Sequence, residues 1–107
     1  MTSVLHSDIK QWKVEIELEQ RELKRKFEEF ERAIELINAK ITIAADAKFN
    51  VRRIHEENYD EVIIGPLESE SDHLHQQFEE FKESYNVRLS YLKSLIMVIN
   101  ENLSIDE

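Results

Sequence analysis

The 107-residue sequence contains no cysteine, one glycine and one proline. The lack of cysteine excludes a disulfide framework, a cysteine-ligated zinc site and a thiol nucleophile. A β-sandwich, a barrel or a doubly wound sheet needs a turn about every ten residues, which the single pair Gly65-Pro66 cannot supply. A glycine-rich phosphate loop is excluded for the same reason. The length allows one domain at most, and the composition leaves an all-α fold.

Long apolar runs are also missing. No stretch approaches the roughly 20 apolar residues that a membrane span needs, so we expect no span. The N-terminal residues lack a basic region followed by an apolar run, which is the pattern of a cleaved signal peptide. We therefore expect the chain to be cytoplasmic as made, or secreted without a cleaved signal peptide.

The net charge of −9 is unevenly distributed. Between His55 and Glu83 there are ten acidic residues and one basic residue, Lys82, so this segment carries the whole excess. Nucleic acid and anionic membranes need a basic surface, and the sequence predicts neither as a partner. Two interpretations remain, a solvated acidic region and a contact for a basic protein surface.

Apolar residues recur at the spacing of packed helices in two arms. In the first arm, about residues 8–64, one row is spaced by seven: Ile9, Ile16, Leu23, Phe30, Ile37, Ala44 and Val51. In the second arm, about residues 70–103, two rows run in parallel: Phe78, Tyr85, Leu92 and Ile99, with Leu74, Phe81, Ile96 and Leu103. The second of these rows has one imperfect step, at Arg88–Leu89.

The pair Gly65-Pro66 predicts the turn between the arms, at residues 65–69. Glycine commonly follows the last residue of a helix, and a proline after it prevents the helix from continuing. We therefore predict a single domain over 1–107, an antiparallel helical hairpin. The first arm is either one long helix or a helix broken between about residues 44 and 60, which gives three helices; β-branched residues at 41–43 and two asparagines disfavour helix there.

These boundaries make the arms unequal, and the inequality predicts a partner. The shorter second arm covers only part of the first, so the N-terminal stripe of the first arm has no cover within the chain. Large apolar side chains lose about 1.5–3 kcal/mol each if they stay in water. Either the first arm folds back as a third helix, or a second copy or another helical protein covers the stripe. The predicted contact residues are Ile9, Trp12, Ile16, Leu23, Phe27 and Phe30.

The sequence indicates neither a catalytic site nor a metal-binding site. On a helix His73 and His75 point about 200° apart, so they cannot share one metal ion. Adjacent carboxylates such as Glu79-Glu80 need a desolvated pocket to act in catalysis, which a helical hairpin does not provide. The sequence predicts no catalytic residue, no metal, no cofactor and no enzymatic activity.

The second arm resembles the WXG superfamily of small helical hairpins. The resemblance is in the turn Ile64-Gly65-Pro66-Leu67 and in the segment Glu70-Ser71-Asp72-His73-Leu74-His75-Gln76-Gln77-Phe78-Glu79-Glu80-Phe81 that follows it. The first arm looks like the long charged helix of the subset encoded beside LXG-domain toxins. The Trp-x-Gly turn is absent, because Ile63 stands where the tryptophan would be, and so is the C-terminal export motif. The resemblance implies an adaptor that binds the N-terminal domain of a type VII secreted toxin and promotes its export.

Three hypotheses follow. The first is a non-enzymatic adaptor for a larger helical protein, such as that toxin domain. The second is a self-associating coiled-coil protein, such as a homodimer. The third is a small regulator, such as an antitoxin or an inhibitor of a basic enzyme, that acts through the acidic segment.

Overall fold

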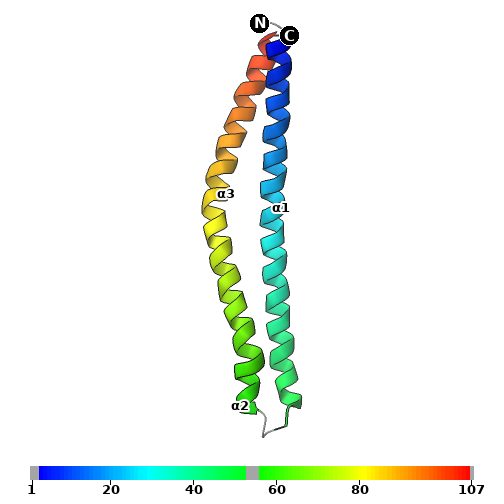
Figure 1. Cartoon of the computed structure of the whole chain (residues 1–107), viewed down its shortest axis with the longest axis vertical. Helices are drawn as coiled ribbons and strands as arrows, with labels where there is room; N and C mark the ends of the chain where they lie inside the picture. Colours follow the sequence, from blue (N-terminus) through cyan, green and yellow to red (C-terminus); the bar gives the residue numbers. More distant parts are fainter. Residues whose placement is uncertain (1–2, 53–55, 107) are drawn as a thin grey trace. The chain divides into compact units, whose positions relative to one another are not determined.

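The chain is an all-α helical hairpin with two long helices, as the sequence predicts (Figure 1). The computed structural model describes residues 3–52 and 56–106. Helix α1 (Ser3–Ala47) is continuous over 45 residues and is followed by the 3-10 turn η1 (Lys48–Asn50). The second arm consists of α2 (Glu56–Tyr59), the π-helix η3 (Asp60–Ile64) and the 42-residue helix α3 (Gly65–Asp106). These three follow one another without an interruption, and none of the described residues forms a strand.

The connection between the arms lies just after residue 47, so the predicted turn at 65–69 is wrong. After η1, Val51 is extended at φ −79° and ψ 137°, and its N–H donates to the carbonyl of Lys48 at 3.0 Å. Of the two forms left open for the first arm, the structure has the break between residues 44 and 60, but this break is the connection between the arms and not a division within the first arm. Residues 53–55 lie outside the described part. The predicted arms of 8–64 and 70–103 are corrected accordingly.

The helix continues through Gly65 and Pro66 because a π-helical turn precedes them. Proline has no N–H, and in an α-helix its ring meets the carbonyl four residues earlier. Here the N–H of Gly65 reaches the carbonyl of Asp60, five residues back, and Gly65 itself is helical at φ −54° and ψ −51°. A Cβ on Gly65 would lie 3.3 Å from that carbonyl oxygen, so glycine relieves the crowding. The pair that predicted a turn instead lies in a widened helix.

Two side-chain contacts tie the end of α1 to the start of the second arm. The hydroxyl of Tyr59 donates to the carbonyl of Ala44, one of the last carbonyls of α1, which have no partner within the helix. Lys48 forms an ion pair with Asp60 at 2.7 Å, and this hydrogen bond raises the pKa of the lysine. Both contacts connect residues more than ten positions apart and favour this place for the chain reversal.

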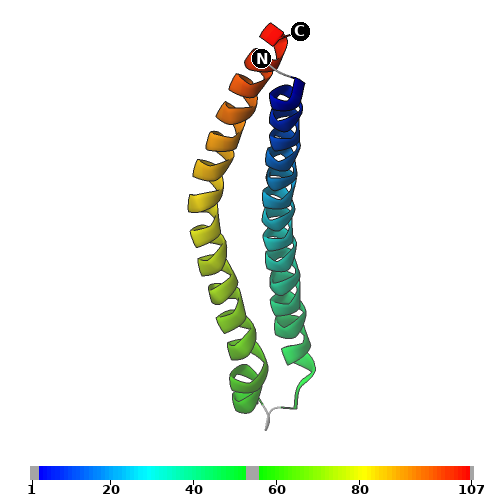
Figure 2. The same ribbon diagram turned by 45° about the horizontal axis from the view of Figure 1, so that its top comes forward.

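The chain divides into two units, each an antiparallel pair of helical segments. Unit 1 comprises residues 1–26 and 81–107, and unit 2 comprises residues 27–80. In unit 1 the first part of α1 and the last part of α3 lie side by side, with the start of α1 and the end of α3 at the same end of the unit (Figures 1 and 2). The imperfect step in the apolar row of α3 lies within unit 1. Leu89 is buried and Arg88 is exposed, so the spacing from Phe81 is eight residues where seven would continue the row.

The core of unit 2 contains an aromatic cluster. The ring of Phe78 lies 5.0 Å from that of Phe27, edge to face, and 5.4 Å from that of Phe30, stacked. Both separations fall in the range in which aromatic pairs stabilise beyond their buried area. Ile37 and Ala44, one and two heptads after Phe30, are buried in the same unit. The seven-residue row of the first arm is therefore the packed face of α1 here.

Candidate protein-binding surface

Three of the predicted contact residues form the core of unit 1. Ile16 is 5% exposed and belongs to a buried cluster with three residues of α3: Leu92, Ile99 and Leu103. Ile9 and Leu23 are half-buried and pack against this cluster. The prediction that this stripe lacks cover within the chain is wrong. Because the second arm begins near residue 56 and not near residue 70, α3 reaches the N-terminal part of α1.

The side chains of Phe27 and Phe30 also pack within the chain. Both rings pack on Phe78 in unit 2, as described above. Of the six predicted contact residues, five are thus half-buried or buried in one unit or the other. The predicted turn residues Gly65 and Pro66 are exposed on the surface of α3.

Trp12 is the exception, and it lies beside an apolar groove of unit 1. The indole is 42% exposed although Trp12 is next to the packed face of α1. The groove has a volume of about 290 Å³, and its lining is apolar except for one asparagine: Ile9, Trp12, Leu95, Val98, Ile99, Asn102 and Leu103. A second hollow, of about 330 Å³, is also lined by Trp12 and Leu95. Trp12 therefore separates two depressions on one side of the unit.

One stretch of α3 beside this groove is apolar around its whole circumference. Residues 95–99 are five consecutive apolar residues, Leu95-Ile96-Met97-Val98-Ile99. Ile96 and Ile99 turn toward α1, whereas Met97 and Val98 are about half exposed. A helix segment that is apolar all round is one that neighbours cover on more than one side. Within the described residues, α1 covers one side only.

Further exposed apolar residues continue this surface along α3. Tyr91 is 61% exposed, and Val87 is half exposed. Val87, Tyr91 and Val98 are spaced by four and seven residues, and Leu95 is four after Tyr91, so all four lie on one side of the helix. We call this surface the Trp12 face; it comprises Trp12, Val87, Tyr91, Leu95 and Val98. Sequence reasoning found Trp12 but missed the α3 residues, although the unbroken run 95–99 in a seven-residue pattern was the signal that could have identified them.

An ion pair lies beside the Trp12 face. The guanidinium of Arg88 donates to both carboxylate oxygens of Glu19, with distances of 3.1 Å from Nε and 2.9 Å from Nη2. Both residues line the second hollow beside Trp12. The hydrogen bonds to Glu19 raise the pKa of Arg88. A two-pronged pair of this kind fixes the orientation of both side chains at the border of the apolar surface.

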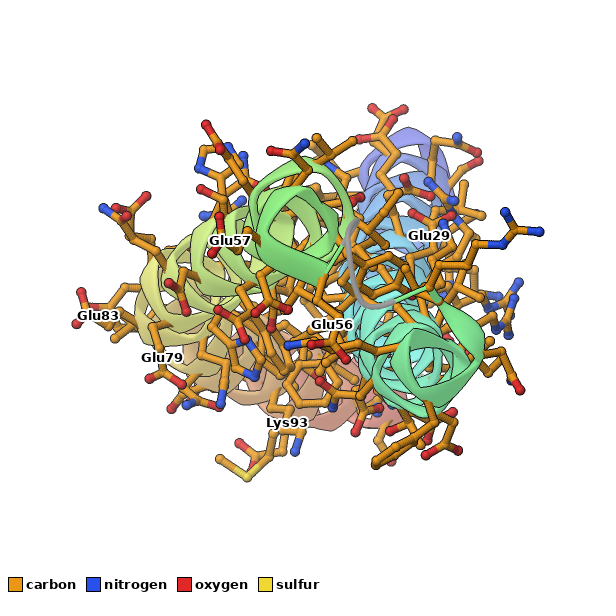
Figure 3. All side chains as sticks on the ribbon, turned by 90° about the horizontal axis from the view of Figure 1, so that it is seen from below. Glu29, Glu56, Glu57, Glu79, Glu83 and Lys93 are labelled. Atoms are coloured by element: carbon orange, nitrogen blue, oxygen red, sulfur yellow. The ribbon has the colours of Figure 1, made fainter. Side chains whose placement is uncertain are left out.

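The net charge is confined to unit 2. Unit 1 contains nine basic and nine acidic residues, whereas unit 2 contains five basic and fourteen acidic residues and carries the entire −9. Figure 3 shows the acidic side chains of Glu79, in unit 2, and Glu83, in unit 1, extending outward from α3. Phe49, in η1, is 90% exposed within the acidic unit. The Trp12 face therefore belongs to the neutral unit, and the acidic surface to the other.

The described residues form neither a metal-binding cluster nor a membrane-spanning helix. Over residues 3–52 and 56–106, no group of three or more His, Asp or Glu side chains is placed to hold a metal ion. The Nδ1 of His75 lies 2.8 Å from the carbonyl oxygen of Ser71 one turn earlier, to which it can only donate, and 3.4 Å from the hydroxyl of the same serine. No helix in the described part of the chain combines the length and the apolar composition needed to cross a bilayer.

Comparison with known proteins adds no family. No family model, no curated protein and no solved structure matches the chain.

Proposed function

We propose that the chain is a non-enzymatic helical adaptor that binds a larger helical protein through the Trp12 face. The observation that carries the proposal is the exposed apolar surface of unit 1, where Trp12, Leu95 and Val98 line a groove of about 290 Å³. Isolated exposed apolar residues are ordinary, but a contiguous patch with a groove is typical of a protein-binding site. Tryptophan and tyrosine are the residues most enriched among those that dominate binding energy.

A helix is the partner element that suits this groove. The groove lies between two antiparallel helical segments, and a third helix laid along it presents apolar side chains at positions three and four apart. Residues 95–99 of α3 would then be covered on a second side, as their composition requires. The resemblance of the sequence to toxin-associated WXG hairpins supplies the candidate partner, the helical N-terminal domain of a type VII secreted toxin, and the candidate role, promotion of its export.

The test is co-purification with the helical N-terminal domain of a type VII secreted toxin. Trp12→Glu and Val98→Glu each place a charge on the Trp12 face, and we expect each to weaken binding more than tenfold. Leu18→Glu is the matched control, because Leu18 is an equally exposed apolar residue of unit 1 on the side of α1 away from α3. Binding that survives both face variants would refute the proposed surface. A failure of the wild-type chain to bind that domain would refute the proposed partner.

A second candidate function rests on unit 2. Its charge of −9 and the 90% exposed Phe49 suit a basic protein surface with an apolar pocket. The chain would then act as an inhibitor of a basic protein. Raising the salt from 0.05 to 0.5 M separates the two candidates, since contacts between exposed charges are screened and an apolar groove contact is not; the Debye length falls from about 14 to about 4 Å over that range.

A further inference from the structure

Unit 1 is neutral in total, but its charges are segregated on the two flanks of the apolar row of α1. One flank carries a row with the spacing three, four, four, three, which keeps residues on one face of a helix: Lys10, Lys13, Glu17, Arg21 and Lys24. The other flank, on which Trp12 lies, carries an acidic row: Asp8, Glu15, Glu19 and Glu22. The basic residues therefore lie on the flank of α1 opposite the Trp12 face.

A groove between α1 and α3 follows the basic row. It has a volume of about 460 Å³, and its lining is Lys10, Lys13, Val14, Glu17, Asn100, Leu103 and Ser104. The α3 side of this groove supplies an amide and a hydroxyl but no acidic side chain. Lys93 lies seven residues before Asn100 on the same face of α3, and Figure 3 shows its side chain extending outward. We call this surface the basic side; it comprises the row on α1 together with Lys93.

The basic residues of this surface have no counter-charge within the described part of the chain. Over residues 3–52 and 56–106 no ion pair involves any of the five: Lys10, Lys13, Arg21, Lys24 and Lys93. On the acidic flank, by contrast, Glu19 pairs with Arg88 and Glu22 pairs with Arg25. The positive charge of the basic side is therefore available to an anionic ligand, whereas part of the acidic flank is neutralised within the chain.

The spacing of the charges favours an acidic helix over a nucleic acid. Lys10 and Lys13 form one basic pair, and the same two positions recur 11 residues later as a second pair, about 16 Å along the helix. The half-buried Glu17 lies midway between the pairs. A duplex carries a phosphate charge about every 1.7 Å, so it would bring phosphates against Glu17, and the chain as a whole carries −9. A helix can present acidic residues to each pair and a basic one to the glutamate.

Apolar residues on the basic side provide the rest of a helix contact. Val14 lines the groove and is 48% exposed, and Leu103 forms part of its floor. Met97, three residues before Asn100, is 59% exposed and belongs to the run 95–99 but not to the Trp12 face. In packed helices an apolar row supplies the contact while charges on its flanks select the partner and its orientation. The basic side has both parts.

We propose that the basic side of unit 1 binds an acidic helical segment of a protein, whose acidic pairs lie 11 residues apart against the two basic pairs. The inference goes beyond the proposed function, because it concerns the other flank of unit 1 and a ligand of defined charge. The row on α1 reads the same in both directions about Glu17, so the charges alone accept the segment in either orientation.

The test uses the full chain and a fluorescent helical peptide of about 20 residues. The peptide carries two glutamate pairs 11 residues apart on one face, with a lysine midway. The control peptide has the same composition with its charges distributed around the helix. We expect the first peptide to bind at least fivefold more tightly by fluorescence anisotropy at 0.05 M salt, and more weakly at 0.5 M salt because exposed charges are screened. Absence of binding, or equal binding of the two peptides, overturns the inference.

Charge-reversal variants locate the bound peptide. Lys13→Glu and Arg21→Glu should each weaken binding at least fivefold, with helical circular dichroism retained. Lys26→Glu is the matched control, because it changes the net charge equally but lies on the acidic flank of α1, four residues after Glu22. A peptide with one glutamate replaced by lysine should bind Lys13→Glu better than the original peptide does, which loss of folding cannot produce. Equal weakening in all three variants would show only the effect of net charge and would contradict the site.

Two further measurements separate this site from other assignments. A short DNA duplex or phosphatidylserine vesicles that bind more tightly than the peptide at the same salt would overturn the choice of an acidic helix. Trp12→Glu should leave peptide binding unchanged, because Trp12 lies on the opposite flank. Loss of peptide binding in Trp12→Glu contradicts the basic side and leaves the proposed function standing, whereas a chain that binds the peptide but no toxin domain overturns only the proposed partner.

Discussion

Replacement of Ile16 by alanine tests whether the N-terminal stripe of α1 is internal core. Ile16 is 5% exposed and contacts a cluster that includes Leu92, itself 1% exposed. An aliphatic residue truncated to alanine in a core costs about 2–5 kcal/mol, the sum of lost burial and the cavity left behind. Unit 1 has only two helical segments and can relax around the gap, so we expect the lower half of that range, about 2–3 kcal/mol, for Ile16→Ala.

The matched control is Leu18→Ala. Leu18 is two residues further along the same helix but 54% exposed, and alanine is a better helix former than leucine. We expect a change within about 0.5 kcal/mol for this variant. Urea unfolding followed by circular dichroism gives both values, with all chains at the same low concentration because association adds concentration-dependent stability.

The comparison has an outcome that would refute the reasoning. If Ile16→Ala and Leu18→Ala lower the free energy of unfolding equally little, Ile16 is not buried within the chain. The stripe that includes Ile9 and Leu23 would then need a partner to cover it. The overhang inferred from the sequence would then be correct and the observed position of the chain reversal wrong. A loss of about 2 kcal/mol or more confined to Ile16→Ala supports the core described here.

Three further predictions concern the chain reversal and the surface. Tyr59→Phe removes the hydrogen bond to the carbonyl of Ala44 and should cost about 1 kcal/mol in urea unfolding; an unchanged midpoint would show that the bond contributes nothing. Pro66→Ala restores an N–H donor within a helix and should raise stability by about 1 kcal/mol, less than the roughly 3 kcal/mol of an unaccommodated proline; a loss of stability would mean that the π-helical turn needs the ring. The pKa of Glu22 is lowered by a hydrogen bond from Arg25, so its contribution to stability is present above the ordinary glutamate pKa and is lost as the pH falls through the lowered value. NMR titration should show this pKa return toward its ordinary value in Arg25→Gln, and a value that stays low would contradict the assigned cause.

The seven-residue spacing of apolar residues was sufficient to predict the helical class and most of the packed face. Ile16, Ile37 and Ala44 are buried, as the row from Ile9 to Val51 predicted, because helical periodicity places such residues on one side whatever the helix packs against. The acidic excess was likewise visible in the sequence, and it coincides with unit 2.

The place of the chain reversal was decided only in three dimensions. Gly65-Pro66 is the strongest local signal for a helix end, yet a π-helical turn accommodates it, and the helix ends at Ala47 instead. Helix-end preferences of single residues describe each possible break in isolation. The free energy of the folded chain depends on all the contacts that each arrangement makes. A reversal near residue 52 lets the two arms cover each other along α1, and a reversal at residue 65 does not.

The position of the chain reversal, after Ala47 and not at Gly65-Pro66, changed the candidate site. The sequence determined that the chain is helical, acidic in one part and richer in apolar surface than one packed face requires. The tertiary structure decided which apolar residues are used internally, because burial depends on which segments of the two arms lie opposite each other. Ile16 and Phe30 became core, whereas Trp12, Tyr91 and Val98 remained at the surface.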